Sequence, residues 1–404
     1  MIPFSPPYIR QEAIDEVVDT LKSGWITTGP KTKRFEKEIT RYCGNRKTLC
    51  VSSATFGLEL ILRWFGVGPG DEVIVPAYTY CATANVVKHT GARLVLVDVE
   101  EDTLTLSPRQ VSEAVTSRTK VILPVDVAGL PAGYEELYAL VNEPKLKRLF
   151  RPGNPNQKKL GRILILTDAA HSFGAWYKGK RAGSYSDVTV FSFHAVKNIT
   201  TAEGGAVALN LPEAFDCEKI YDYLNGMSLH GQSKDALAKV TDRAGWEYDV
   251  PEPGLKGNMT DIQASLGLIA LKYYDTETLP ARKKIMERYQ QAFSALPYLR
   301  LPVLKKQQAE TAYHLYLLRM PGITSEQRNE IIRKIFDRGV AVNVHYKPLP
   351  LLSAYRDHTA EAYPVSLRNY AWEISLPVYE QLTDEQVEKV IDVCIECIMD
   401  VCNP

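Results

Sequence analysis

Short runs of β-branched and aliphatic residues alternate with amphipathic stretches from about residue 46 to residue 210. The amphipathic stretches at 56–65 and 82–90 have the spacing of helices that bury one face. Strands that alternate with helices in this way form βαβ units, in which helices cover both faces of a mostly parallel sheet. The pattern therefore predicts an α/β fold with a seven-stranded sheet. Its strands are expected at 48–53, 72–77, 93–99, 120–125, 162–170, 187–193 and 205–210.

The pattern changes near residue 265, and a long helical stretch at 259–296 spans the change. Pro280 is expected to break this helix, because proline removes a backbone donor and clashes with the preceding turn. The chain is therefore predicted to have two domains, a large one at 1–265 with an N-terminal arm and a small α/β one at 266–404. In the small domain, strands are expected at 312–320 and 340–346, and helices at 325–339 and from Thr383 onward.

One segment, 143–162, is rich in Lys, Arg, Pro and Asn and is interpreted as an insertion into the large domain. A partner-binding arm is one possible role for it. A solvated surface excursion is favoured, because surface loops gain length at little entropic cost.

Composition and charge exclude several classes of protein. Lys plus Arg and Asp plus Glu number 48 each, so no net charge draws the chain to nucleic acid or to an anionic membrane. The first residues do not have the pattern of a signal peptide, and no apolar run reaches the ~18 residues of a membrane span. Seven cysteines in 404 residues favour reduced thiols and a cytoplasmic protein. Cys394 and Cys397 lie on one helical face and are interpreted as packed thiols, not as a metal site.

Candidate chemistry follows the ends of the strands, where parallel sheets collect ligands. Ser53, Ala54 and Thr55 follow the first strand and begin a helix. Small residues at a helix N-terminus leave backbone N–H groups free for a phosphate. Tyr78 and Tyr80 follow the next strand, where a ring either stacks on a flat cofactor or belongs to the core.

Two charged residues follow later strands. Asp168 ends an apolar strand, where a carboxylate is costly without a positive partner. A pyridinium nitrogen is such a partner, and a helix N-cap is the alternative role. His171 is placed to hydrogen-bond a phenolic oxygen or to stack on a ring. Lys197 is either a solvated loop residue or a Schiff-base nucleophile, which a lysine becomes when partial burial lowers its pKa.

The combination is more specific than its parts. Four features follow one another on strand ends of one sheet: a phosphate-binding helix start, an aromatic ring, Asp168 and Lys197. Ser192 adds a hydroxyl for the phosphate. Together they describe a pyridoxal phosphate site with an anion anchor, a ring stack, a pyridinium partner and an imine-forming amine.

With these features, the chain resembles the fold-type-I, pyridoxal-phosphate-dependent nucleotide-sugar aminotransferases of the DegT/DnrJ/StrS type. The resemblance runs nearly end to end. The motifs that carry it are SGWITTGP at 23–30, PAYTY at 76–80, TDAAH at 167–171, SFHAVKN at 192–198, EGG at 203–205, PGLKGNMTDIQ at 253–263, VHY at 344–346 and LP at 376–377.

The resemblance implies a role for each matching residue. Lys197 would form the internal imine and shuttle protons, and Asp168 would face the pyridine nitrogen. Tyr80 would stack on the cofactor ring, and His171 would lie near the ring oxygen. The phosphate would be bound by Ala54, Thr55 and Ser192. Members are homodimers, and the stretch 256–258 resembles the segment lent to the neighbouring subunit's phosphate. Many relatives have Asn in place of Lys256 and Arg in place of Asn258, and Asn258 is the favoured contact.

The resemblance also implies a reaction, the amination of a nucleotide-linked keto sugar, with glutamate as the expected donor. The motifs are most similar to members that aminate C4 of UDP-linked 4-keto sugars. Some members carry histidine in place of the lysine and dehydrate sugars, which Lys197 argues against. A regulator that binds cofactor or sugar nucleotide without turnover is the rival from another class. An intact Lys197 and Asp168 argue against it, because binding alone needs no proton shuttle.

Overall fold

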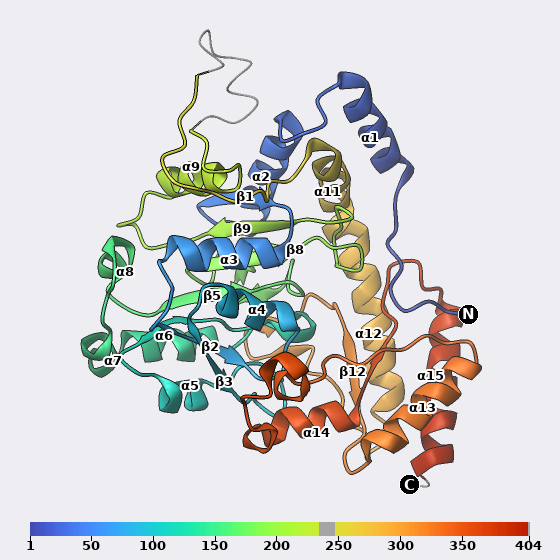
Figure 1. Ribbon diagram of the computed structural model, residues 1–404. Helices are drawn as coiled ribbons and strands as arrows, with labels where there is room; N and C mark the ends of the chain where they lie inside the picture. The colour runs from blue at the N-terminus through green and yellow to red at the C-terminus, as the bar shows by residue number, and fades with distance from the viewer. Residues whose placement is uncertain (234–246, 403–404) are drawn as a thin grey trace.

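The computed structural model describes residues 1–233 and 247–402. Seven strands form one sheet in the order β1-β9-β8-β5-β4-β2-β3 (Figure 1). β9 pairs antiparallel with β1 and β8, and the other neighbours pair parallel. The predicted α/β fold with a mostly parallel seven-stranded sheet is therefore confirmed. The strands are β1 (Lys47–Val51), β2 (Glu72–Pro76), β3 (Arg93–Val97), β4 (Thr119–Ile122), β5 (Leu164–Asp168), β8 (Val188–Ser192) and β9 (Gly205–Leu209).

Both faces of the sheet are buried, because alternate strand residues enter two different core clusters. Val73 and Val75 of β2 pack with helices on one face, whereas Ile74 packs with helices on the other. Strands covered on both faces carry near-continuous hydrophobic runs, which is the pattern of this sequence. One face carries α3 (Ala54–Trp64), α4 (Cys81–His89) and α9 (Cys217–Met227). The other carries α2 (Pro30–Cys43), α5 (Pro108–Ala114), α6 (Tyr134–Asn142) and α11 (Asp261–Tyr273).

The long stretch at 259–296 is helical from Asp261 to Phe293, and the break expected near Pro280 is instead a single π-helical turn at Tyr274–Thr278 between α11 and α12 (Leu279–Phe293). Pro280 lies in the first turn of α12, where a missing N–H costs nothing. α11 begins with a capping box, in which Thr260 and Gln263 satisfy each other's backbone donors. The predicted domain boundary at residue 265 falls inside α11, and the division into two domains stays a prediction.

The C-terminal part has its own core around a two-stranded sheet of β12 (Tyr316–Arg319) and β13 (Glu373–Leu376). The predicted strand at 340–346 is wrong. Val340 is buried, Asn343 is exposed and the rest are partly buried, and the stretch forms only isolated bridges, from Val340 to Ile2 and from Asn343 to Ser375. The helices here are α13 (Ser325–Asp337), α14 (Pro364–Trp372) and α15 (Asp384–Cys402), and Cys394 and Cys397 are buried thiols of α15.

The remaining elements lie at the surface. The 143–162 segment forms two short helices, α7 (Pro144–Leu149) and α8 (Pro155–Leu160), whose basic side chains are exposed. The segment was expected to be solvated, but it is partly packed on the large domain: Gln157 is buried and donates to the Phe65 carbonyl after α3. α1 (Gln11–Ser23) precedes α2, and a small sheet joins β6 (Trp176–Tyr177), β7 (Lys180–Arg181), β10 (Lys305–Lys306) and β11 (Ala309–Glu310). Among the described residues, no helix is both long and apolar enough to cross a membrane.

Candidate active site

A cavity of about 440 Å³ lies at the ends of β1, β5 and β8. This volume lies within the range of small-molecule sites. Residues from the C-terminal part, His345 and Tyr346, complete its wall. Seven of the eight predicted site residues line it: Ala54, Thr55, Tyr80, Asp168, His171, Ser192 and Lys197. The eighth, Asn258, does not.

One end of the cavity is built for an anion. Ser53 caps α3 by accepting the Phe56 N–H at 3.1 Å, and the first residues of the helix line the cavity. The N-terminus of a helix presents unpaired N–H groups and a partial positive charge. Gly205 of β9 runs so close that a Cβ there would lie 2.6 Å from the Ala54 nitrogen. The glycine therefore lets the strand pass beneath the helix end, and the hydroxyls of Thr55 and Ser192 complete a site that fits a phosphate.

Asp168 is a buried carboxylate that faces the cavity. It accepts a hydrogen bond from the Thr83 hydroxyl at 2.8 Å and from the Ala170 N–H at 3.1 Å. Burial raises the pKa of Asp168 above its ordinary value, against the opposing effect of these donors and of the Lys197 charge. The N-cap alternative is wrong, because a turn and not a helix follows Asp168. A protonated ring nitrogen in the cavity would supply the positive partner that this carboxylate needs.

Lys197 is partly buried, and its ammonium has no hydrogen-bond partner within 1–233 and 247–402. Burial lowers the pKa of Lys197 to about 8, and the nearby Asp168 charge opposes this shift. At pH 8 about half of such amines are neutral and nucleophilic, against ~0.3% for a lysine with an ordinary pKa. Lys197 is therefore suited to form an imine, and the solvated-loop interpretation does not describe it.

The loop that carries Lys197 is held from behind by Asn198. The Asn198 amide donates to the Tyr274 hydroxyl at 3.0 Å and to the Ala312 carbonyl at 2.7 Å. Its oxygen lies 2.7 Å from Nδ1 of His314. The π-helical turn after α11 places Tyr274 behind this loop. Sequence reasoning missed these partners, because they come from segments far along the chain.

His171 is buried, and both of its ring nitrogens have partners. Nδ1 accepts the Ala128 N–H at 3.3 Å, so Nε2 carries the ring proton and faces the Tyr346 hydroxyl at 2.8 Å. The ring also packs against His314, with centroids 4.3 Å apart. Burial and then the Lys197 charge lower the pKa of His171 well below its ordinary value, which keeps the ring neutral. The phenolic oxygen that His171 bonds within the chain is thus that of Tyr346.

The two tyrosines after β2 have different environments. Tyr78 is fully buried, and its hydroxyl donates to the His345 carbonyl at 2.6 Å. Tyr80 is 61% exposed at the rim of the cavity, with its ring 6.1 Å from that of Tyr346. Tyr78 therefore belongs to the core, and Tyr80 is the ring that is available to a ligand.

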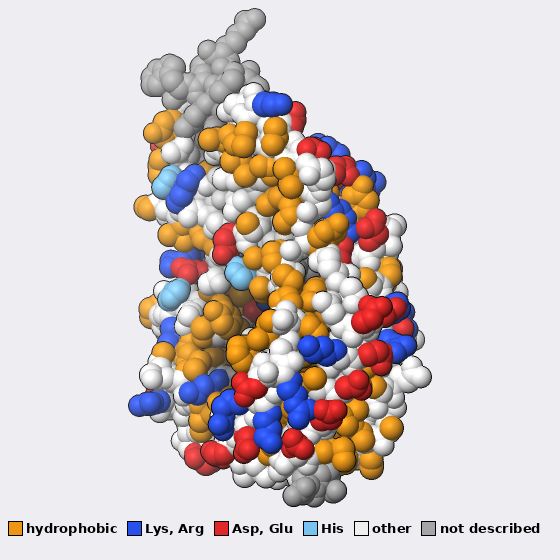
Figure 2. Space-filling view, turned by 90° about the vertical axis from the view of Figure 1, so that its right-hand side faces the viewer, with side chains coloured by type: hydrophobic (Ala, Val, Ile, Leu, Met, Phe, Trp, Pro, Cys, Tyr) orange, Lys and Arg blue, Asp and Glu red, His pale blue; other side chains and the backbone are white. Residues whose placement is uncertain are grey.

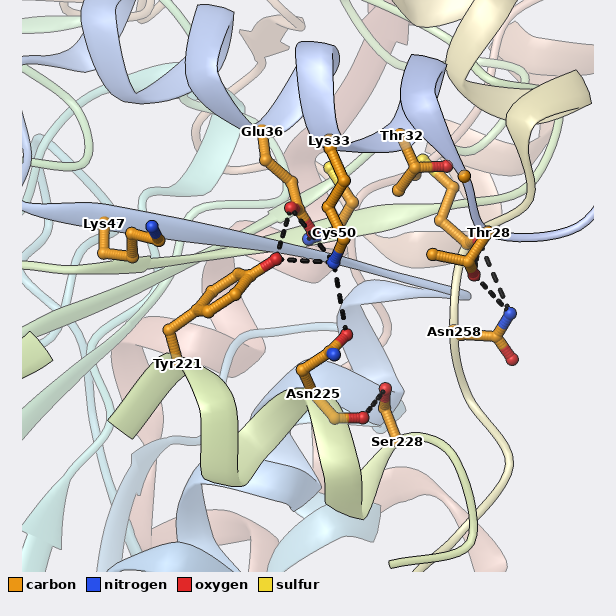
Figure 3. A network of polar contacts seen from close by, with 12 residues as sticks. Thr28, Thr32, Lys33, Glu36, Lys47, Cys50, Tyr221, Asn225, Ser228 and Asn258 are labelled. Atoms are coloured by element: carbon orange, nitrogen blue, oxygen red, sulfur yellow. Dashed lines mark hydrogen bonds and ion pairs between the residues drawn. The ribbon is translucent and has the colours of Figure 1, made fainter. Parts of the chain in front are cut away.

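Asn258 lies outside the cavity, beside β1. Its amide donates to the Thr28 hydroxyl at 2.6 Å, and Thr28 in turn donates to the Met259 carbonyl (Figure 3). The same view shows how α2 and α9 are joined across β1 by Glu36. Glu36 accepts the Cys50 N–H at 2.9 Å and the Tyr221 hydroxyl at 2.7 Å. Asn258 is thus fixed on a well-bonded part of the fold, without a place in its own chain's cavity.

The fold and this site define a fold-type-I pyridoxal phosphate enzyme: a mostly parallel sheet, a buried carboxylate, a helix N-terminus and a nucleophilic lysine meet at one cavity. The chain belongs to the DegT/DnrJ/EryC1/StrS aminotransferase family, whose sequence model matches residues 7–150 and 158–394. The unmatched residues 151–157 lie within the segment interpreted as an insertion. The enzyme is therefore a pyridoxal-phosphate-dependent aminotransferase.

Individual relatives agree with this assignment. The chain is 36% identical over 399 residues to the spore coat polysaccharide biosynthesis protein SpsC of Bacillus subtilis, covering 97% of this chain and 95% of that protein. It superposes on Spr1654 of Streptococcus pneumoniae, described as a sugar aminotransferase and solved in the PMP form, with a TM-score of 0.95 and 46% identity. That match covers 99% of this chain and 100% of the other. Helicobacter pylori PseC, an aminotransferase in pseudoaminic acid biosynthesis, gives a TM-score of 0.85 at 26% identity, with 99% of both chains covered.

Proposed function

We propose that this enzyme transfers an amino group from glutamate to a nucleotide-linked keto sugar, in the synthesis of an amino sugar for a surface polysaccharide. A UDP-linked 4-keto-6-deoxy hexose or a related sugar is the expected substrate. The observation that carries the proposal is the pairing of Lys197 and Asp168 in one cavity, in a chain similar to SpsC and PseC. The names of those two proteins support the sugar and polysaccharide part of the proposal, and the glutamate donor rests on the family resemblance.

The cavity residues that follow the strand ends each have a role in this reaction. When bound, pyridoxal phosphate supplies an electron sink that stabilises the carbanion formed next to the substrate nitrogen. Lys197 would hold the cofactor covalently through Nζ and, once displaced by a substrate amine, would move the proton between the two carbons that exchange it. Asp168 would keep the ring nitrogen protonated. The N-terminus of α3, with Thr55 and Ser192, would hold the phosphate.

We also propose that the enzyme works as a homodimer with shared active sites. α1 exposes Ile14, Val18 and Leu21, each 39–54% accessible and on one helical stripe. Figure 2 faces the side that carries α1, and hydrophobic side chains gather over its upper half. Exposed apolar side chains gathered on one helix face are common at protein interfaces. Asn258 would then serve the partner's cavity, since it lies outside its own.

The test is a product analysis. The purified enzyme, supplied with pyridoxal phosphate and glutamate, is incubated with a panel of UDP- and dTDP-linked 3-keto and 4-keto sugars. The expected result is one amino-sugar nucleotide formed in step with 2-oxoglutarate. Loss of water from the sugar without amination would favour a dehydratase of the same fold. Cofactor or sugar-nucleotide binding with no turnover on any sugar would favour a regulatory protein. The cytoplasmic location stays a prediction.

A further inference from the structure

Asp168 is held by its backbone and by its side chain at the same time. Its backbone N–H donates to the Pro124 carbonyl at 2.9 Å, and its own carbonyl accepts the Asp126 N–H at 3.1 Å. These two bonds extend the pairing of β5 with β4. The Ala170 N–H then bonds Oδ1, and the Thr83 hydroxyl bonds Oδ2 at 2.8 Å. Among the described residues, Thr83 is the only side chain that bonds this carboxylate.

Thr83 is itself supported by a second hydroxyl. It lies in the first turn of α4, after β2, and is fully buried. Thr79 lies four residues earlier and is also buried, with its hydroxyl oxygen 3.0 Å from that of Thr83. Thr83 has one hydroxyl proton and donates it to Asp168, so its oxygen accepts the proton of Thr79. Two buried hydroxyls therefore form a short chain that points toward the carboxylate.

Burial and the bonded donors act on Asp168 in opposite directions. Burial raises the pKa of Asp168. The Thr83 hydroxyl has the largest opposing effect on this pKa, followed by the Ala170 N–H and the Lys197 charge. Both donors bond the ionised form of the acid, and the first turn of α4 adds a partial positive charge. Removal of the Thr83 hydroxyl would thus favour the protonated acid.

Apart from the lysine, the titratable groups of the cavity supply this carboxylate with no nearby charge. Burial lowers the pKa of His171 and His345 and raises that of Tyr346, so all three are neutral near pH 7. His194 and Glu203 also line the cavity, but their side chains are 47% and 66% exposed, and solvent screens their charges. The carboxylate therefore depends on the donors that bond it directly.

We propose that Thr83, supported by Thr79, is a positioning residue for the cofactor: its hydroxyl binds the Asp168 carboxylate and keeps it available to the ring nitrogen of pyridoxal phosphate. A carboxyl group keeps that nitrogen protonated only while it is itself ionised. Without the hydroxyl, the neutral acid becomes more populated and the electron sink weakens. Thr83 touches no substrate in this role, so its effect is the same for any amino donor and any keto sugar.

The first test needs neither cofactor nor substrate. ¹³C NMR of enzyme labelled at the aspartate carboxyl carbons follows the titration of Asp168, whose signal is identified by its absence in Asp168→Asn. In Thr83→Val the titration midpoint should rise by about one pH unit, a tenfold change in proton affinity, because the charged form loses a donor. Thr83→Ser keeps the hydroxyl and should titrate as the wild type does. An unchanged or lowered midpoint in Thr83→Val overturns the inference.

The variants are chosen to keep Asp168 in place. Valine keeps the shape of Thr83, and the bonds to β4 and from the Ala170 N–H remain. Thr83→Ala removes the same donor in a second way and must raise the midpoint too. Thr167→Val is the matched control, because Thr167 is a fully buried threonine of β5 whose side chain lies on the opposite face of the sheet from Asp168. It should leave the midpoint unchanged.

The second test follows the half-reaction of the loaded enzyme with glutamate through the absorbance of the bound cofactor. Thr83→Val should lower the rate constant about tenfold, with half-saturation by glutamate changed less than twofold. Activity is lost as the pH falls through the pKa of Asp168, so the acid limb of the profile should move up by about one pH unit. A slower reaction with an unmoved acid limb would mean that Thr83 only packs α4, and it overturns the inference. If the wild type does not react with glutamate, the proposed donor is wrong, and the NMR titration still decides the role of Thr83.

Discussion

The cavity has two walls that are built in different ways. The strand-end wall carries Asp168 and Lys197, which lie in short sequence motifs directly after β5 and β8. The opposite wall carries His345 and Tyr346, which come from the C-terminal part and are held by bonds such as that between Tyr346 and His171. The first wall has groups suited to make and break bonds at the cofactor, and the second has groups suited to recognise a substrate. Changes in the first should stop both half-reactions, whereas changes in the second should affect one substrate more than the other.

The largest effect is expected from Lys197→Ala. Removal of the amine removes both the covalent anchor and the proton carrier, so transamination should fall at least ~10⁴-fold with every substrate. Product formation is measured by chromatography, and borohydride reduction of the wild type should attach the cofactor to Lys197. Lys180→Ala, an exposed lysine of β7, is the control. Turnover that survives in Lys197→Ala would remove the role assigned to the strand-end wall.

Asp168→Asn should lower turnover about 10²- to 10³-fold, because the ring nitrogen loses the charge that keeps it protonated. The melting temperature should change little, since an amide fits the place of a buried carboxylate whose pKa is raised. Asp126 provides the contrast. It is buried outside the cavity lining and accepts bonds from Ser172, Tyr134, Tyr185 and the Ala132 N–H.

Asp126→Asn should therefore cost about 1–3 kcal/mol of the free energy of unfolding, because an amide has one acceptor oxygen where the two carboxylate oxygens accept from all four of these donors. Denaturant unfolding and steady-state kinetics measured on both variants separate the two roles. Equal losses of stability in the two variants would mean that Asp168 is a structural residue.

A third wall is expected from the partner subunit. Mixing Lys197→Ala with Asn258→Ala dimers should regenerate activity, because each hybrid dimer contains one site with an intact Lys197 and an intact Asn258. Random pairing makes half of the dimers hybrid, so about a quarter of all sites should recover. Mixing Lys197→Ala with Asp168→Asn is the control, since both residues line the same chain's cavity and no site is restored. If subunit exchange is shown and the first mixture stays inactive, Asn258 does not serve the partner's site.

The smallest effect is a shift in a titration. In enzyme freed of cofactor, the reaction of Lys197 with an amine-directed reagent should rise with pH, reach half of its maximum near pH 8 and level off about one pH unit higher, because only the neutral amine reacts. A lysine with the ordinary pKa continues to gain reactivity toward pH 10, and labelled peptides from exposed parts of the chain give the comparison. Mass spectrometry of labelled peptides gives both profiles in one experiment. Identical profiles would mean that the cavity does not change the Lys197 amine.

The sequence by itself determined the sheet and the strand-end wall. Parallel strands bring their carboxyl ends to one edge, so Asp168, Lys197 and the start of α3 meet once the seven strands form. It did not determine the other contacts. Thr83 reaches Asp168 across 85 residues of sequence, and Tyr346 reaches His171 across 175. The stretch at 340–346 has a strand-like pattern, yet β13 pairs with β12 and leaves His345 free to line the cavity. Such contacts depend on how the C-terminal part packs against the sheet, which no local periodicity records, so only the tertiary structure decided them.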